Sequence, residues 1–208
     1  MCNLYDVGPA PNQARASWEE SARKALGKLL KAYNIRKTDP GLVVRVCEEG
    51  RTFEPTIMRW GFAREFNPAV NNARAEKLGG GMWGKAFRER RCLIPVAAFY
   101  EWTGPKGRKQ TYAIRREDGA WMWMAGLWET HREHGLCYSM ITTAAAAWIA
   151  GIHERMPAVL PTIDAAEHYL AGDDTSVEPL EEPMPIVACE NPLRFKIPGP
   201  PRSDGLGL

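Results

Sequence analysis

The first two residues, Met1-Cys2, combine two nucleophiles on one backbone unit. Removal of an initiator methionine is favoured when the next side chain is small, and it leaves Cys2 with a free amine and a thiol on adjacent carbons. An α-amino group has a pKa near 7.7–8.0, so an appreciable fraction is uncharged at neutral pH. The amine can condense with an aldehyde, after which the thiol closes a thiazolidine ring. Position alone is weak support, because cysteines also occur second by chance.

Three further segments hold polar side chains suited to proton transfer or anion binding. Glu101 lies between two aromatic residues, where desolvation would raise the pKa of its carboxyl and suit it to acid/base work. An exposed, outward-facing strand position is the alternative for Glu101, and a structural histidine is the alternative for His153. The segments are Asn71-Asn72-Ala73-Arg74-Ala75-Glu76, residues 91–102 ending in Phe99-Tyr100-Glu101-Trp102, and Gly151-Ile152-His153-Glu154-Arg155-Met156-Pro157.

Together with Met1-Cys2, these segments resemble the SRAP family, the SOS response-associated peptidase or abasic-site processing proteins. The match runs from Cys2 to about Pro161 in the family's order. The resemblance implies a thiazolidine crosslink between Cys2 and the ring-opened aldehyde of abasic sites in single-stranded DNA, which shields the lesion in the DNA damage response. It also implies lyase activity through the imine and autocatalytic removal of the initiator residue, a peptidase-like reaction.

The resemblance implies four catalytic residues: Cys2, Asn72, Glu101 and His153. Asn72 would position the amine and the sulfur without adding charge, although a turn residue is the alternative. Glu101 would act as the acid/base in imine formation. His153 would donate a proton to the sugar ring oxygen and assist reversal of the adduct. An imine from an amine needs no metal and no cofactor, so we expect neither.

Two sets of side chains are expected to contact DNA. Arginines bind phosphate through a bidentate guanidinium, although an ion pair with Glu76 or Glu154 competes. Aromatic side chains stack on the bases that flank the lesion, although most tryptophans should lie in the core. The phosphate candidates are Arg74 and Arg155, the stacking candidates are Trp60, Phe99 and Trp102, and Trp121, Trp123 and Trp128 are expected in the core.

The chain departs from the family pattern at positions that bear on DNA contact. Asn3-Leu4 stands where many relatives have Gly-Arg, so a cation is missing at the fourth position, and Arg36 or Lys37 is a candidate replacement. Ala98 stands for a usual glycine and Glu154 for a usual Asp. The proposed nucleophile and the proton-transfer groups are unchanged.

Two other functions remain open from the residues. An N-terminal-nucleophile amidohydrolase or amidotransferase would use Cys2 on glutamine, but the sequence contains no recognisable glutamine-site motif. A non-covalent single-stranded DNA-binding module would leave Cys2 incidental. Steep salt dependence of binding is expected of both DNA hypotheses, so it does not separate them.

Composition and charge describe one globular domain with a basic main body. The chain has 208 residues, 45% hydrophobic and 25% charged, with a net charge of +2. Residues 1–160 carry 24 Lys and Arg against 16 Asp and Glu, whereas residues 161–190 carry 8 acids and no Lys or Arg. The basic body favours a polyanionic partner, although a well-solvated surface is the alternative.

The same composition argues against a membrane protein. No window approaches the roughly 20 apolar residues that span a bilayer, and the first twenty residues have no continuous apolar run. The five cysteines form no Cys-x-x-Cys pair, which argues against a zinc ribbon or a thioredoxin-like site. We expect a cytoplasmic monomer with reduced thiols, associated with the nucleoid when bound to DNA.

The elements that must position these residues are mostly strands. The pattern predicts an α+β fold in residues 1–195, a mainly antiparallel sheet or partly closed β-barrel with flanking helices, followed by an irregular tail over 196–208. Residues 103–109 read as a turn with a basic tip. The predicted strands are 42–46, 53–62, 92–100, 111–115, 121–128 and 136–143, and the predicted helices are 18–33, 76–90, 145–150 and 164–171.

Overall fold

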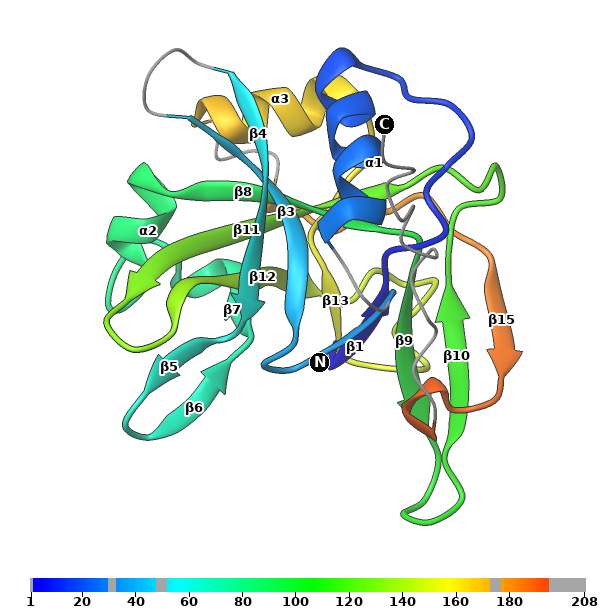
Figure 1. Cartoon of the computed structure of the whole chain (residues 1–208). Coiled ribbons are helices and arrows are strands. Elements are labelled where there is room, and N and C mark those ends of the chain that lie inside the picture. Colours follow the sequence, from blue (N-terminus) through cyan, green and yellow to red (C-terminus); the bar gives the residue numbers. More distant parts are fainter. Residues whose placement is uncertain (1, 30–32, 48–51, 173–176, 195–208) are drawn as a thin grey trace.

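The computed structural model describes residues 2–29, 33–47, 52–172 and 177–194, which form two main β-sheets with helices along their edges (Figure 1). Among these residues, five strands of the larger sheet close into a barrel in the order β12-β4-β3-β8-β11, because β11 also pairs with β12. Among the five pairings that close the barrel, only that of β12 with β4 is parallel. The predicted fold class is confirmed. The strands are β3 (Pro40–Val46), β4 (Phe53–Trp60), β8 (Arg91–Val96), β11 (Met122–His131) and β12 (Gly135–Ala144).

Short strands extend the barrel where the chain carries its polar motifs. β7 (Asn72–Arg74) runs parallel to β12, and β13 (Arg155–Pro157) runs antiparallel to it. Both therefore flank the last residues of β12, with Thr142 opposite Arg74 on one side and Pro157 on the other. β14 (Val159–Leu160) pairs with β11, and β5 (Phe62–Arg64) forms a hairpin with β6 (Asn67–Val70) just before β7.

The second sheet has the order β15-β10-β9-β1-β2, and all of its pairings are antiparallel. Ala97 alone separates β8 of the barrel from β9, so one stretch of chain serves both sheets. The sequence analysis did not predict three strands of this sheet, β1, β2 and β15, the last of which lies within the acidic stretch. The members are β1 (Leu4–Asp6), β2 (Asn34–Arg36), β9 (Ala98–Thr103), β10 (Gln110–Ile114) and β15 (Ile186–Cys189).

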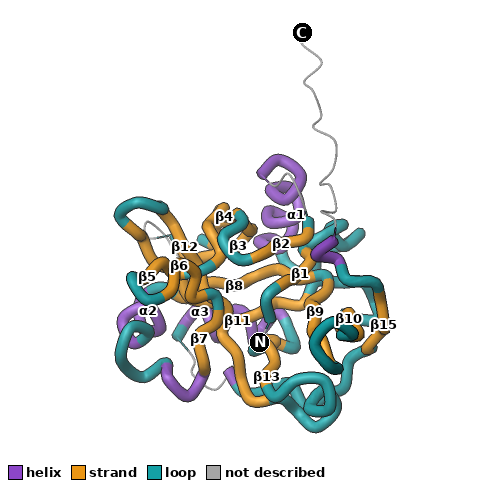
Figure 2. Tube along the Cα trace, turned by 90° about the horizontal axis from the view of Figure 1, so that it is seen from below, coloured by secondary structure: helices purple, strands orange, loops and turns teal. Residues whose placement is uncertain are grey.

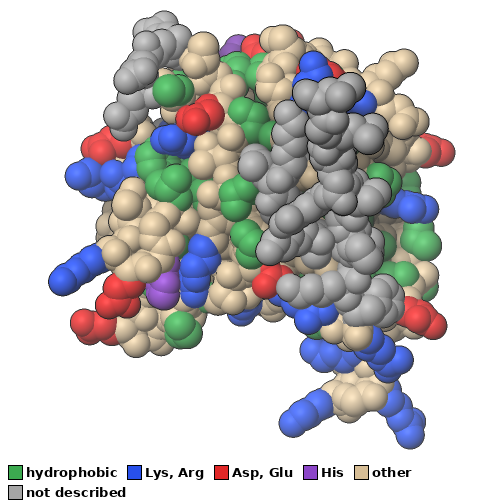
Figure 3. Space-filling view, in the orientation of Figure 1, with side chains coloured by type: hydrophobic (Ala, Val, Ile, Leu, Met, Phe, Trp, Pro, Cys, Tyr) green, Lys and Arg blue, Asp and Glu red, His purple; other side chains and the backbone are tan. Residues whose placement is uncertain are grey.

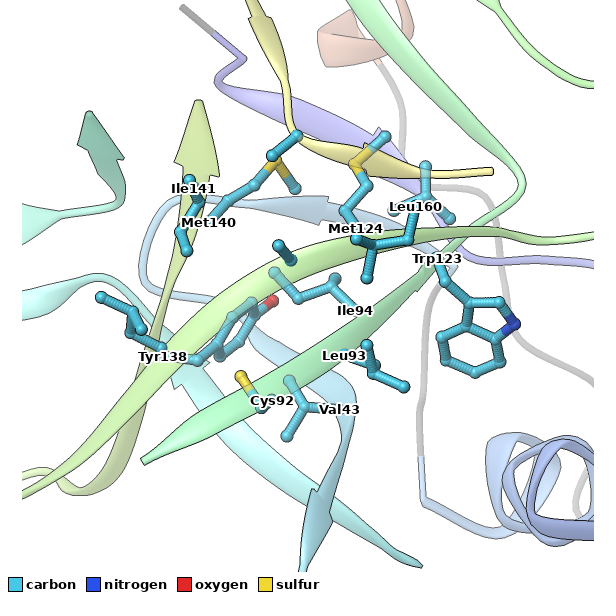
Figure 4. Packing of buried hydrophobic residues seen from close by; sticks show 14 of the residues in the cluster. Val43, Cys92, Leu93, Ile94, Trp123, Met124, Tyr138, Met140, Ile141 and Leu160 are labelled. Carbon is cyan, nitrogen blue, oxygen red and sulfur yellow. The ribbon is translucent and has the colours of Figure 1, made fainter. Parts of the chain in front are cut away.

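The barrel interior is filled by large apolar side chains from its own strands (Figure 4). Val43, Ile94, Met124 and Met140 come from four different strands and are fully buried. Trp121, Trp123 and Trp128 are also buried, which confirms the prediction for these three residues.

The hydroxyls of Tyr5 and Tyr138 share a buried hydrogen bond that ties β1 to the barrel. Gly41 passes against both rings: a Cβ at this position would lie 2.6 Å from the Tyr5 hydroxyl and closer still to that of Tyr138. Any larger residue at Gly41 would therefore push β1 away from the barrel. Through this contact the barrel fixes the strand that follows Cys2.

The helices agree only partly with the sequence pattern. α1 (Ser17–Leu29) ends earlier than predicted, residues 30–32 lie outside the described part, and residues 34–36 form β2. α3 (Ile163–Ala171) is confirmed; the Thr162 side chain caps it and Gly172 ends it at a φ of 113°. Within 76–90 the helical pieces are η1 (Ala75–Lys77), a short 3-10 turn, and α2 (Gly84–Glu89), separated by the glycine run.

The predicted helix over 145–150 is wrong, because this segment forms turns. Ile149 and Ala150 both donate their N–H groups to the carbonyl of Ala146, and His153 donates to Ile149, so the chain closes two successive turns and then meets Ala145 again through the carbonyl of Glu154. A 3-10 turn, η3 (Pro192–Arg194), ends the described chain, and the predicted tail lies outside it. In the described residues, no helix is long and apolar enough to cross a membrane.

Candidate functional site

Cys2 lies where the two sheets meet, with β7, β13 and β9 around the start of β1 (Figure 2). The Cys2 residue is only 1% exposed. Its carbonyl oxygen accepts hydrogen bonds from the side-chain amides of Asn71 at 3.1 Å and Asn72 at 2.9 Å. Its thiol donates to the carbonyl of Leu4 at 3.3 Å. Asn71, just before β7, and Asn72, its first residue, thus hold the Cys2 carbonyl in place by hydrogen bonds.

The two neighbouring asparagines both donate hydrogen bonds to the Cys2 carbonyl, but they differ in their other contacts. Asn72, predicted from the sequence, meets Cys2 directly, and its Oδ1 is a buried acceptor without a hydrogen-bond partner among the described residues. Asn71, which the sequence analysis did not select, is buried and also accepts the indole N–H of Trp60 through its carbonyl at 3.1 Å. The pair of adjacent asparagines in the sequence was the signal that could have identified Asn71, because both side-chain amides bond to the same carbonyl.

Burial raises the pKa of the Cys2 thiol well above its ordinary value, and the negative charge of Glu101 acts in the same direction. The thiol therefore stays protonated at neutral pH. A protonated thiol is a poor nucleophile, so this environment does not favour direct attack by sulfur on a substrate. It is compatible with a reaction in which an amine attacks first.

Glu101 lies on the inward face of β9. Strand alternation puts it on the same side as Phe99, and its residue is 2% exposed, so the exposed-strand alternative is wrong. Burial raises the pKa of the Glu101 carboxyl to about 7, while the positive charge of Lys109 acts to lower it. A carboxyl with such a pKa both accepts and donates a proton near neutral pH.

His153 lies between the turns that follow β12 and the start of β13. Its Nδ1 accepts the backbone N–H of Arg155 at 2.9 Å, so the neutral ring carries its proton on Nε2. Burial lowers the pKa of His153, and the charge of Lys109 contributes in the same direction. Because Lys109 acts on both Glu101 and His153, these two groups share one electrostatic environment.

The prediction that Arg155 binds a phosphate needs correction. Its terminal nitrogens donate to both carboxylate oxygens of Glu76 at 3.0 Å and to the carbonyl of Thr142 at 2.6 Å. The Arg155 side chain is only 10% exposed. Its guanidinium is committed to an internal ion pair that ties β13 to η1 and β12, as the competing interpretation expected.

We expect Arg155→Ala to lower the free energy of unfolding by about 2 kcal/mol, because charge-assisted hydrogen bonds to Glu76 and Thr142 are lost. Urea unfolding measures this change. Glu76→Gln is the matched control and should cost less than about 1 kcal/mol, since the Glu76 side chain is half exposed. If Arg155→Ala leaves the stability unchanged and lowers DNA affinity tenfold, the original prediction that Arg155 binds a phosphate would be supported instead.

Two of the three predicted stacking residues are also corrected. Trp60 and Phe99 are 0% exposed, so neither offers a ring face to a base. Trp102 is half-buried, and its indole Nε1 is a buried donor without a partner among the described residues. Arg74 is exposed on β7 and forms no ion pair with a described residue. Trp102 and Arg74 therefore stay as candidates.

Phe66 is a surface aromatic that the sequence analysis did not select. It is 77% exposed in the turn between β5 and β6, and the hairpin of these two strands directly precedes β7, which carries Asn72 and Arg74. The flanking Glu65 and Asn67 were the signal that the ring points to solvent.

Comparisons with known proteins agree with the motifs. The family model for SOS response associated peptidase (SRAP) matches residues 1–191. Abasic site processing protein YMR114C of Saccharomyces cerevisiae is 29% identical over 177 residues, covering 79% of this chain and 47% of that protein. Abasic site processing protein YoaM of Bacillus subtilis is 28% identical over 170 residues, covering 74% of this chain and 72% of that protein.

Solved structures share the fold at lower identity. A crystal structure from Bacteroides thetaiotaomicron has a TM-score of 0.71 at 18% identity, covering 96% of this chain and 97% of that one. A second, from Bordetella bronchiseptica, has a TM-score of 0.71 at 22% identity, covering 91% of this chain and all of that one. These likenesses support the fold alone. The chain spans about half the length of curated relatives from yeast and chicken.

Proposed function

Because the chain belongs to the SOS response associated peptidase (SRAP) family, we propose that it binds single-stranded DNA containing abasic sites and crosslinks to them through Cys2. The adduct would shield the lesion during the DNA damage response. The observation that carries this proposal is Cys2 itself: its carbonyl is held by two asparagine amides, and its thiol lies within the electrostatic reach of a buried carboxyl with a pKa of about 7. The names of the relatives, abasic site processing proteins, support the substrate.

The chemistry proceeds in two balanced steps once Cys2 is the first residue. Its uncharged amine attacks C1′ of the ring-opened sugar, and loss of one water gives an imine. The thiol then adds across the C=N bond: sulfur bonds to C1′, and the thiol proton passes to nitrogen. The thiazolidine forms without an oxidant, a reductant or a metal. The raised pKa of Cys2 supports this order, because the amine and not the sulfur begins the reaction.

The other three residues divide the proton transfers between them. Glu101 takes the proton released by the attacking amine and returns one to the departing hydroxyl. The Nε2–H of neutral His153 donates a hydrogen bond to the sugar ring oxygen, which stabilises the negative charge that develops on this oxygen as the ring opens, and the same contact assists reversal of the adduct. Asn72 orients Cys2, with a buried acceptor left to meet the amine. Arg74, Trp102 and Phe66 are the surface residues we assign to DNA contact.

Two further activities follow from the same site. The imine is the intermediate from which lyase cleavage of the strand would proceed, and capture by the thiol removes it. Autocatalytic removal of Met1 is the peptidase reaction consistent with the family description. A cysteine amidohydrolase is less well supported, since that chemistry needs a thiolate and burial disfavours one here.

We expect the protein to form a one-to-one species with single-stranded DNA bearing one abasic site, and this species should survive denaturation. Intact mass spectrometry first verifies that the preparation begins at Cys2, and a denaturing gel then measures the product. The same oligonucleotide without the abasic site is the control and should give no product. No product under conditions where binding is measured would refute the covalent mechanism.

A further inference from the structure

The hairpin between β9 and β10 carries cations that the proposed chemistry does not use. Thr103 pairs with Gln110, and residues 104–109 between them are all exposed. Lys106, Arg108 and Lys109 occupy three of the four positions from 106 to 109, and the hairpin from 103 to 110 contains no acidic residue. In Figure 3 it projects below the rest of the molecule as a stalk tipped with basic side chains.

The turn that presents these cations has a defined backbone. Arg108 donates its N–H to the carbonyl of Pro105 at 3.0 Å, which closes a turn over Lys106 and Gly107. Gly107 has a φ of 88°, as the third position of a type II turn requires. The cations thus lie on an ordered turn, so the hairpin would lose little backbone entropy when a ligand binds there.

The hairpin begins at the candidate site. β9 carries Glu101 and Trp102 immediately before the turn, and the charge of Lys109 acts on both Glu101 and His153. None of the three cations forms an ion pair with a described residue, so all are available to an external anion. β1 pairs antiparallel with β9, with Tyr5 opposite Phe99, so Cys2 before β1 lies toward the end of β9 from which the hairpin projects. The phosphates next to a nucleotide held at Cys2 could therefore reach the hairpin.

We propose that the hairpin Thr103–Gln110 is a phosphate-binding arm that holds the DNA backbone beside the reacting nucleotide. This inference rests on the proposed function. The arm would supply positive charge that Leu4 does not provide at the start of the chain. Ordered but exposed Lys and Arg side chains bind phosphates without reading sequence, so the arm contributes affinity and register but no base preference.

The test replaces the two cations furthest from Glu101, in the double variant Lys106→Gln/Arg108→Gln. Each phosphate contact to single strands contributes about 0.7 to the slope of log affinity against log salt. We expect the variant to bind oligothymidylate about tenfold more weakly at low salt, with a slope smaller by about 1.4. With abasic DNA, the concentration for half-maximal crosslinking rate should rise similarly, while the plateau rate stays within twofold.

The matched control is Lys85→Gln/Arg88→Gln, which removes the same charge from exposed positions of α2 and should leave the slope unchanged. Equal slopes for the hairpin variant and wild type would overturn the arm. Equal losses in both double variants would also overturn it, since net charge alone would explain them. If the hairpin variant lost binding to polyglutamate but not to oligothymidylate, the hairpin would bind an acidic protein and not DNA, which would also overturn the proposal. Undamaged DNA tests the arm even if no adduct forms.

Discussion

Replacing Cys2 with alanine is expected to reduce the denaturation-resistant product by about a hundredfold or more, because no thiol remains to close the ring. The amine persists in this variant, so an imine still forms reversibly and is lost on denaturation. Borohydride reduction before denaturation should trap that imine in Cys2→Ala and Cys2→Ser alike. The measurement is the yield on a denaturing gel with and without borohydride, using protein whose mass shows that Met1 is absent.

Cys47→Ser is the control for losing a thiol elsewhere, since Cys47 is half-buried just after β3. It should form as much stable product as the wild type. A stable adduct from Cys2→Ala without borohydride would identify another nucleophile. Trapped imine without stable product, in contrast, would separate the roles of amine and sulfur and would also disfavour a cysteine amidohydrolase, which needs sulfur for its first step.

The barrel was predictable because its strands carry local signals. Residues 121–128 and 136–143 are apolar runs bounded by turn residues, and they became β11 and β12. The predicted helix over 145–150 had a local signal too, yet this segment closes turns on the carbonyl of Ala146, and Ala145 bonds to Glu154 on the returning chain. Local propensity loses wherever a distant partner satisfies the backbone better.

The sequence identified candidate site residues but not the face on which each side chain lies. Both faces of β9 are covered at Tyr100 and Glu101: Glu101 shares the inward side with Phe99, whereas Tyr100 packs in a second, smaller cluster against which Trp102 lies half-buried. Nothing in this aromatic sequence indicates which side chains face which cluster. Trp60 shows the same ambiguity in β4. The hydrogen bond from Asn71 to the Cys2 carbonyl joins residues 69 positions apart in the sequence. The packing of the two sheets brings them together, and no local pattern predicts it.

The Glu101 carboxyl is stabilised in its protonated form, and this has a stability consequence. Its folded pKa of about 7 lies above the usual value of 4.5 for glutamic acid, so it favours folding fully below about pH 4.5, and that contribution is lost as pH rises through 7. Glu101→Gln removes this penalty. Between pH 4.5 and pH 8, its free energy of unfolding should gain about 3 kcal/mol relative to wild type, measured by urea unfolding.

The same substitution should slow crosslinking about a hundredfold under single-turnover conditions while changing DNA affinity less than about twofold. Because the charge of Glu101 acts on Cys2, the pKa of the Cys2 amine is measured in each protein, and the two rates are compared at equal fractions of uncharged amine. If the protonated carboxyl expels water from the carbinolamine, this ratio is largest below pH 7 and falls as the proton is lost above it.

Glu89→Gln, which neutralises an exposed carboxyl on α2, is the matched control and should change neither rate nor stability. A ratio that stays constant from pH 5.5 to pH 9, or a large loss of affinity at an unchanged rate, would contradict proton transfer by Glu101. Because proton transfer and fold stability depend on the same desolvation, both readouts should move together around pH 7. The carboxyl thus lowers the stability of the fold at the pH where the proposed reaction would use it, which is the trade-off expected if Glu101 is catalytic.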